Sequence, residues 1–190
     1  MYYISQHTTQ TLEVKQSKFI AHLIPYNLYD TTLEALKIEH PKARHFVVAY
    51  RYLNKFEQIV EHSSDDGEPK GTSGKPSLMV LQGKELINTA VIIVRYFGGT
   101  KLGTGGLVRA YSDAVNLVVD SSELLEYKKQ TQSMIEIQYT DLRFVEYELE
   151  SFGVDILKKE FGDSIVFTIL ADEQSMQMFL HKVQRVVKTL

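Results

Sequence analysis

Apolar and polar positions alternate along several stretches in the first two thirds of the chain, and this two-residue period predicts β-strands. The stretches 17–26 and 44–53 carry it, and the second is also rich in β-branched and aromatic residues. We expect 44–53 to pair with 57–62. The run 89–97 is almost continuously apolar, which predicts a strand that is buried on both faces.

The helical period of 3.6 residues predicts three helices in the same part of the chain. The first has Thr31 and Glu34 at the spacing of a capping box and ends before Pro41, since the residue preceding a proline disfavours helical geometry. The second has Pro76 in its first turn. The third gathers its apolar residues on one helical face: Leu107, Tyr111, Ala114, Val115, Val118 and Val119.

From residue 134 onward the pattern predicts a strand, a helix, two strands joined at 162–163, and a last helix. Asp141 and Asp172 stand where the N-caps of the two helices are expected. The apolar positions of the last helix continue in register to Val187. This order is most of a split βαβ unit, the ferredoxin-like plan, whose closing strand would have to follow Leu190 or be absent.

The order of these elements predicts an α+β protein of two domains, which we place at residues 1–131 and 132–190; the length alone suits one large domain or two small ones. The 190 residues are 44% hydrophobic and 24% charged, which is typical of a globular chain. The chain has no cysteine, which excludes disulfides, thiolate zinc sites and a cysteine nucleophile. No stretch reaches the roughly 18 apolar residues of a membrane span, and 1–10 does not resemble a signal peptide, so we expect a cytoplasmic protein without membrane contact.

Charge is unevenly distributed along the chain, whose net charge is −3. Residues 40–112 hold ten Lys and Arg against six Asp and Glu, whereas residues 133–190 hold six against ten. Two solvated faces would explain this difference equally well. If it is functional, the first of these regions is the better candidate for a surface that attracts anions.

A polar loop at 63–76 carries one candidate motif: Ser64, Asp65, Asp66, Gly67, Glu68 and Thr72. It is not a phosphate-binding Walker A loop, because Gly67 and Gly74 are separated by six residues and Pro76 replaces the required hydroxyl. Its three carboxylates do not complete a set of magnesium ligands by themselves. A turn rich in Ser, Asp, Gly and Pro is the simpler interpretation.

The stretch 95–111, RYFGGTKLGTGGLVRAY, is the second candidate motif. It runs from a buried strand through a glycine loop to a helix that begins near Thr104 or Gly105, which is the context of dinucleotide binding. The spacing does not fit that motif, because Val108 stands where the third glycine is required. Backbone N–H groups at the start of the helix still suit an anion.

The two motifs together supply the candidate residues for binding an anion or a nucleic acid. They are Lys70, Lys75, Arg95, Lys101, Gly103, Thr104, Gly105, Gly106 and Arg109. For Arg95 the alternative is a structural ion pair with a carboxylate of the polar loop.

Sequence spacing assigns no catalytic residue, metal ligand or cofactor. The six histidines form no H-E-x-x-H pattern, and no G-x-S-x-G elbow is present. His40 and His45 lie five apart on either side of a proline, and a catalytic zinc needs three protein ligands.

The two motifs, SSDDGEPKGTSGKP and VRYFGGTKLGTGGLVRAYSDAV, resemble those of the Impact/YigZ family in order and spacing. The segment SKFIAHL and the pattern of His40, Ala43 and His45 fit the same family. The resemblance is specific over residues of about 15 to 125, and the second domain is similar in plan to that of the bacterial members. Phe-Val-Val follows His45 where many relatives carry a more polar Asn-Cys pair, which weakens any catalytic role for this strand.

The resemblance implies a first domain with the ribosomal protein S5 domain 2-like fold. It implies a ferredoxin-like second domain similar to the last domain of elongation factor G, which carries the two fold types in tandem in its ribosome-facing part. Eukaryotic relatives regulate translation by competing for an activator of a stress-responsive kinase, through an additional N-terminal domain that this sequence does not show.

Our leading hypothesis is therefore a non-enzymatic regulator of translation that binds RNA, the ribosome or a translation factor through the glycine-rich basic surface. Tyr96 or Tyr111 would be available to stack on bases. The alternative is an enzyme acting on a phosphorylated small molecule or nucleotide, with Asp65, Asp66 and Glu68 as metal ligands or general bases. A protein-interaction module with purely structural loops is a third hypothesis. The sequence leaves the oligomeric state open.

Overall fold

The computed structural model describes all 190 residues and divides into two compact units, Met1–Tyr127 and Lys128–Leu190. The two-domain α+β prediction is confirmed. Gln130 and Thr131, which the sequence analysis placed in the first domain, lie in the first strand of the second unit.

The first unit is built on a five-stranded antiparallel sheet whose strand order is β2-β3-β6-β4-β5. Its strands are β2 (Thr8–Val14), β3 (Ser17–Pro25), β4 (His45–Leu53), β5 (Ile59–Ser64) and β6 (Thr89–Tyr96). The apolar run of β6 is explained by its central place between β3 and β4, because every residue from Thr89 to Arg95 is buried. Outside this sheet, the short strands β1 (Tyr2–Tyr3) and β7 (Leu125–Glu126) pair with each other.

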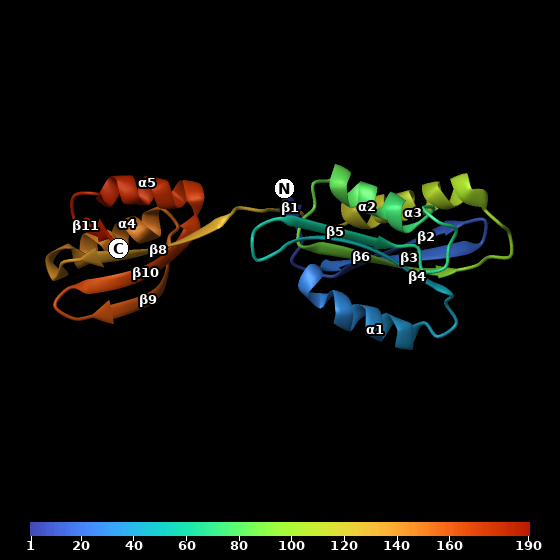
Figure 1. Ribbon diagram of the computed structural model, residues 1–190, viewed down its shortest axis with the longest axis horizontal. Helices are drawn as coiled ribbons and strands as arrows, with labels where there is room; N and C mark the ends of the chain where they lie inside the picture. The colour runs from blue at the N-terminus through green and yellow to red at the C-terminus, as the bar shows by residue number, and fades with distance from the viewer. The chain divides into compact units, whose positions relative to one another are not determined.

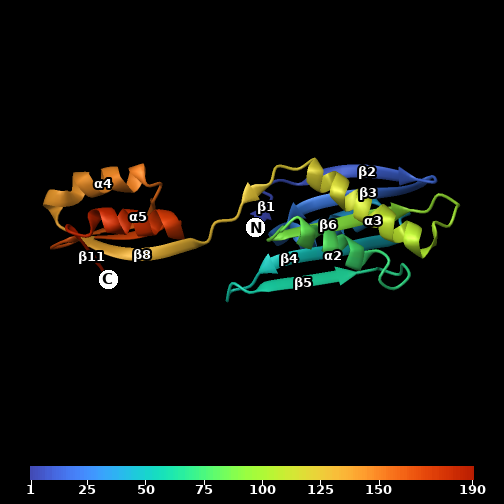
Figure 2. The ribbon, with the colours of Figure 1, turned by 90° about the horizontal axis from the view of Figure 1, so that it is seen from above.

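Helices cover both faces of this sheet (Figure 1). Helix α1 (Tyr29–Glu39), preceded by a 3-10 turn at Tyr26–Leu28, lies on one face, and α2 (Gly74–Gly83) and α3 (Gly103–Asp120) lie on the other. Figure 2, seen from above, shows α2 and α3 crossing the sheet on the same side. The six apolar residues predicted on one face of α3 are all buried in the larger core cluster, which confirms that stripe.

The ends of the helices agree only in part with the predictions. The predicted capping box is wrong: α1 begins at Tyr29, and the Thr31 hydroxyl donates to the Leu28 carbonyl oxygen at 3.1 Å from within the first turn. A hydroxyl in the first turn can bond backward to the chain as readily as it can cap, so the spacing alone was misleading. The predicted end before Pro41 and the position of Pro76 in the first turn of α2 are confirmed.

Two glycines of the motifs are required by close backbone approach. A Cβ on Gly98 would lie 2.0 Å from the backbone carbon of Gln16, and the Gly98 N–H donates to the Ser17 hydroxyl at 3.1 Å. A Cβ on Gly74 would lie 2.7 Å from the backbone carbon of Ser64. Gly98 thus packs against the start of β3 and Gly74 against the end of β5. Packing explains both glycines without a ligand.

The second unit is a four-stranded antiparallel sheet of order β11-β8-β10-β9, with two helices packed against one core cluster. The strands are β8 (Gln130–Ile137), β9 (Asp155–Phe161), β10 (Ile165–Asp172) and β11 (Val187–Thr189). The helices are α4 (Leu142–Ser151), which follows a 3-10 turn at Tyr139–Asp141, and α5 (Glu173–Val183). This strand order is that of the ferredoxin-like plan, which is confirmed. None of the helices in either unit is long and apolar enough to cross a membrane.

The expectation that the closing strand follows Leu190 or is absent is wrong, because β11 closes the sheet by pairing with β8. Helix α5 ends at Val183, and Val186 and Val187 pack on the same core as the helix. The spacing of these two residues matched a helix because both pack on the core, although neither lies in the helix. The N-cap at Asp172 is confirmed, since its carboxylate accepts from the Ser175 N–H at 3.0 Å, whereas the Asp141 side chain makes no capping hydrogen bond.

Candidate functional site

The amino end of α2 is closed by a carboxylate of the chain itself. Asp65 Oδ1 accepts from the N–H groups of Ser73 and Gly74 at 3.1 and 2.8 Å and from the Ser73 hydroxyl at 2.7 Å, while Oδ2 accepts from the Gly71 N–H at 2.7 Å. Burial by itself would raise the pKa of Asp65, but these hydrogen bonds outweigh it and lower the pKa below its usual value. An external anion therefore finds the helix end beside Lys75 already occupied.

Asp66 fixes the same loop to the start of β4. Its backbone lies in the left-handed region with φ of +43°, and its Oδ2 accepts from the Phe46 N–H at 2.6 Å. His45 Nδ1 donates to the Asp66 carbonyl oxygen at 2.8 Å, and a Cβ on Gly67 would meet the His45 ring at 3.6 Å. The carboxylate and the imidazole thus hold loop and strand together.

Glu68 is the centre of a buried polar cluster that joins the two motifs. Its Oε1 accepts from Arg95 Nη1 and, at 2.8 Å, from the Tyr111 hydroxyl, and His45 Nε2 lies 3.9 Å away. Glu68 and Arg95 are 8% and 6% exposed and Tyr111 is fully buried. Burial, followed by the charge of Glu68, raises the pKa of Tyr111 well above its usual range, so the phenol stays a neutral donor. The proposed stacking of a base on Tyr111 is therefore wrong.

Arg95 forms the structural ion pair that was the alternative to a direct anion contact. Its guanidinium lies 5.4 Å from the Phe19 ring and 5.9 Å from the Phe97 ring. Its Nε is buried and has no hydrogen-bond partner. The chain thus leaves one donor of this guanidinium unused.

The two motifs meet in a pocket of about 320 Å³. Its walls come from the polar loop, the end of β6, the glycine loop and the first turns of α3: Glu68, Pro69, Arg95, Phe97, Lys101, Leu102, Gly103, Thr104 and Leu107. The sequence candidates that it brings together are Glu68, Arg95, Lys101, Gly103 and Thr104. The apolar part of the wall was not predicted from the sequence, where its only signal was Phe97, an aromatic residue followed directly by glycines.

The amino end of α3 lies at this pocket and, unlike that of α2, has no side-chain cap. The N-cap residue is Leu102, which makes no capping hydrogen bond, and the first turn has no acidic residue. Gly103, Thr104 and Gly105 are exposed. Unpaired N–H groups and the positive end of the helix dipole favour an anion at such a place.

Gly103 and Gly105 keep this helix end unobstructed. The backbone of Gly103 has φ of +74°, which favours glycine. Beyond its chain neighbours and the backbone of its own helix, no atom lies within 4 Å of the position that a Cβ on Gly105 would take, and the backbone there is not left-handed. Packing does not explain the glycine at 105.

The remaining candidates lie outside the pocket wall. Lys70, Lys75 and Arg109 are exposed, and Gly106 is half-buried. The buried Thr72 hydroxyl donates to the Pro69 carbonyl oxygen at 2.7 Å, and the Ser64 hydroxyl accepts from the Asp66 N–H at 3.3 Å. Thr72 and Ser64 therefore shape the polar loop.

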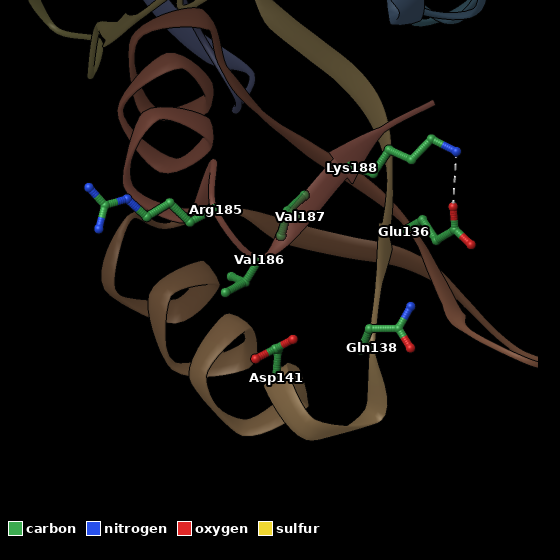
Figure 3. Close-up of a pocket in the computed structure, with 7 residues that line it drawn as sticks. All are labelled: Glu136, Gln138, Asp141, Arg185, Val186, Val187 and Lys188. Carbon is green, nitrogen blue, oxygen red and sulfur yellow. Dashed lines mark ion pairs between the residues drawn. The ribbon is translucent and has the colours of Figure 1, made fainter.

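A second pocket, of about 350 Å³, lies in the second unit between β8, β11 and the turn before α4 (Figure 3). Its lining is Glu136, Gln138, Asp141, Arg185, Val186, Val187 and Lys188. Lys188 pairs with Glu136 at 3.5 Å, and Figure 3 shows the Arg185 side chain pointing away from that pair. Acidic and basic groups here offset each other, so the first pocket is the better anion site. Neither unit contains a cluster of three or more His, Asp or Glu side chains that could hold a metal ion.

Comparison with known proteins finds relatives over both units. The model of the Impact N-terminal domain matches residues 15–119, and a model described as a domain of unknown function matches residues 135–186. A Haemophilus influenzae protein described as an IMPACT family member is 37% identical over 170 residues, which are 88% of this chain and 82% of that protein. The Escherichia coli IMPACT family member YigZ is 32% identical over 160 residues, which are 83% of this chain and 78% of that protein.

One solved structure is similar over the whole chain. It is described as the crystal structure of a hypothetical protein, is 28% identical in sequence and has a TM-score of 0.67. The match covers 100% of this chain and 95% of that one.

Proposed function

This chain belongs to the Impact family, and from that premise we propose that it regulates translation in the cytoplasm by binding RNA, the ribosome or a translation factor, without catalysis. The binding surface is the one around the start of α3. The observation that supports it most is the contrast between the two helix ends, since Asp65 fills the amino end of α2 and no side chain fills that of α3.

Four exposed cations are available for contacts with phosphate groups: Lys70, Lys75, Lys101 and Arg109. They provide attraction that depends on salt but not on sequence. Arg95, a candidate by sequence, is not among these exposed cations, because it is buried against Glu68. Tyr96 is half-buried, and its hydroxyl lies 2.9 Å from His40 Nδ1.

The alternative enzyme depends on three carboxylates that the fold already uses. Asp65 caps α2, Asp66 holds the start of β4, and Glu68 is bonded to Arg95 and Tyr111. No observation favours their action on a substrate.

Co-sedimentation with ribosomes, at low and at moderate salt, tests the proposal. The variant Lys101→Gln/Arg109→Gln removes two charges near the start of α3, and Arg143→Gln/Lys182→Gln removes two exposed charges from the second unit as a matched control. We expect the wild type and the control to co-sediment and the first variant to lose at least tenfold in affinity. Nuclease treatment then separates a protein partner from RNA. Equal binding by all three proteins would contradict the proposed surface, and no binding at low salt would exclude the ribosome as the partner.

A further inference from the structure

We propose that the pocket at the start of α3 binds one nucleotide of a single-stranded RNA, with its phosphate on the amino end of α3 and its base against Phe97. The inference rests on the proposed function and names the part of the ligand that this surface takes. Two independent features of the pocket point to it, one for the phosphate and one for the base.

The phosphate position follows from the unused hydrogen-bond donors at the start of α3. The N-cap residue Leu102 makes no capping hydrogen bond to the first turn of α3, and Lys101 and Thr104 line the pocket. Arg95, more than nine-tenths buried, lines the pocket as well and has an unpartnered Nε. A buried donor without a partner is costly in a folded chain, and the protein itself supplies no acceptor for this one.

The charges of the wall favour a single phosphate. Glu68 is the only acidic residue of the lining, and its carboxylate is already bonded to Arg95 and Tyr111. Lys101 is then the one cation of the wall without an acidic partner in the structure. One positive charge together with a helix dipole suits a phosphodiester or a monophosphate better than a triphosphate, which normally brings a magnesium ion with it.

The base position follows from the apolar part of the wall. Phe97 is 55% exposed, although it directly follows the central strand, and Pro69, Leu102 and Leu107 line the pocket with it. Exposed aromatic rings in single-strand binding proteins stack on bases with little preference for sequence. A volume of about 320 Å³ lies at the lower end of the range of ligand sites, which suits one nucleotide.

Amide chemical shifts of the full chain, labelled with ¹⁵N, test this arrangement. The probes are uridine, uridine 5′-monophosphate and a five-residue oligouridine. We expect the monophosphate and the oligonucleotide to shift the same amides, those of Thr104, Gly105 and Gly106, and uridine to bind at least tenfold more weakly. Binding of the monophosphate without binding of the oligonucleotide overturns the assignment to RNA.

Phe97→Leu tests the base position, and Phe56→Leu is the control because Phe56 is an exposed phenylalanine elsewhere in the same unit. We expect Phe97→Leu to weaken oligouridine about tenfold and the control to leave it unchanged. Equal affinity of the two variants overturns the base position. If ribosomes still bind while no nucleotide shifts the α3 amides, the inference fails and the proposed function stands.

Discussion

Replacing Gly105 with alanine separates the stability of the first unit from its binding function. The added Cβ meets no atom of another element within 4 Å, and the backbone at this position is helical and not left-handed, so the substitution creates neither a clash nor strain. Only the difference in helix propensity remains, which favours alanine by roughly 0.5–1 kcal/mol. For a unit of this size the gain corresponds to about 2–4 °C in melting temperature.

The effect on binding has the opposite sign. A Cα–Cβ bond in an α-helix tilts toward the amino end, so the methyl group of Gly105→Ala points toward the place that we assign to phosphate. We expect oligouridine to bind about tenfold more weakly, which corresponds to about 1.4 kcal/mol. Fluorescence anisotropy measures the affinity, and urea unfolding measures the stability.

Gly83→Ala at the end of α2 is the matched control, since a Cβ there also meets nothing within 4 Å. We expect it to leave binding unchanged. A Gly105→Ala protein that is more stable and binds as well as the wild type refutes the idea that this glycine serves the ligand. A destabilised Gly105→Ala protein refutes the structural reasoning itself.

Three further predictions concern stability, each measured by urea unfolding. Asp65→Ala removes four hydrogen bonds at the start of α2 and should cost about 2–4 kcal/mol; an unchanged midpoint would show that the cap is dispensable. Gly98→Ala places a Cβ 2.0 Å from the backbone carbon of Gln16 and should cost roughly 3 kcal/mol or more, whereas a mild effect would mean that the turn between β2 and β3 moves aside. Burial and, after it, two neighbouring histidines lower the pKa of His22 from 6.5 to about 4. Between these values the unfolded chain binds more protons, so stability should fall as pH drops from 6.5 to 4, and His22→Asn should flatten that dependence.

The periodicity of the sequence was sufficient to predict most strands and helices, because burial on one face imposes a pattern that packing preserves. The prediction failed where buried residues do not belong to the element that their spacing indicates. Val186 and Val187 are packed on the core as helical residues would be, yet they lead into a strand. Tyr111 belonged to a correctly predicted buried stripe, so it could not also stack on a base.

The candidate site was less predictable than the fold, because its parts are distant in the sequence. Glu68 and Arg95 are 27 positions apart, and Glu68 and Tyr111 are 43 apart. Charge alone suggested that Arg95 was a free cation or an ion pair, and only the fold distinguishes the two. Likewise, the sequence could not show that Asp65 fills the amino end of α2, since its hydrogen bonds reach residues six to nine positions ahead across an irregular loop. It could not show either that the amino end of α3 stays open.

A crystal structure of the protein soaked with uridine 5′-monophosphate tests the central claim most directly. We expect the phosphate within hydrogen-bond distance of the backbone N–H groups of Thr104 to Gly106, beside Lys101, with Asp65 still in place at the amino end of α2. An empty pocket at saturating nucleotide, or a phosphate that displaces Asp65 from α2, would contradict it.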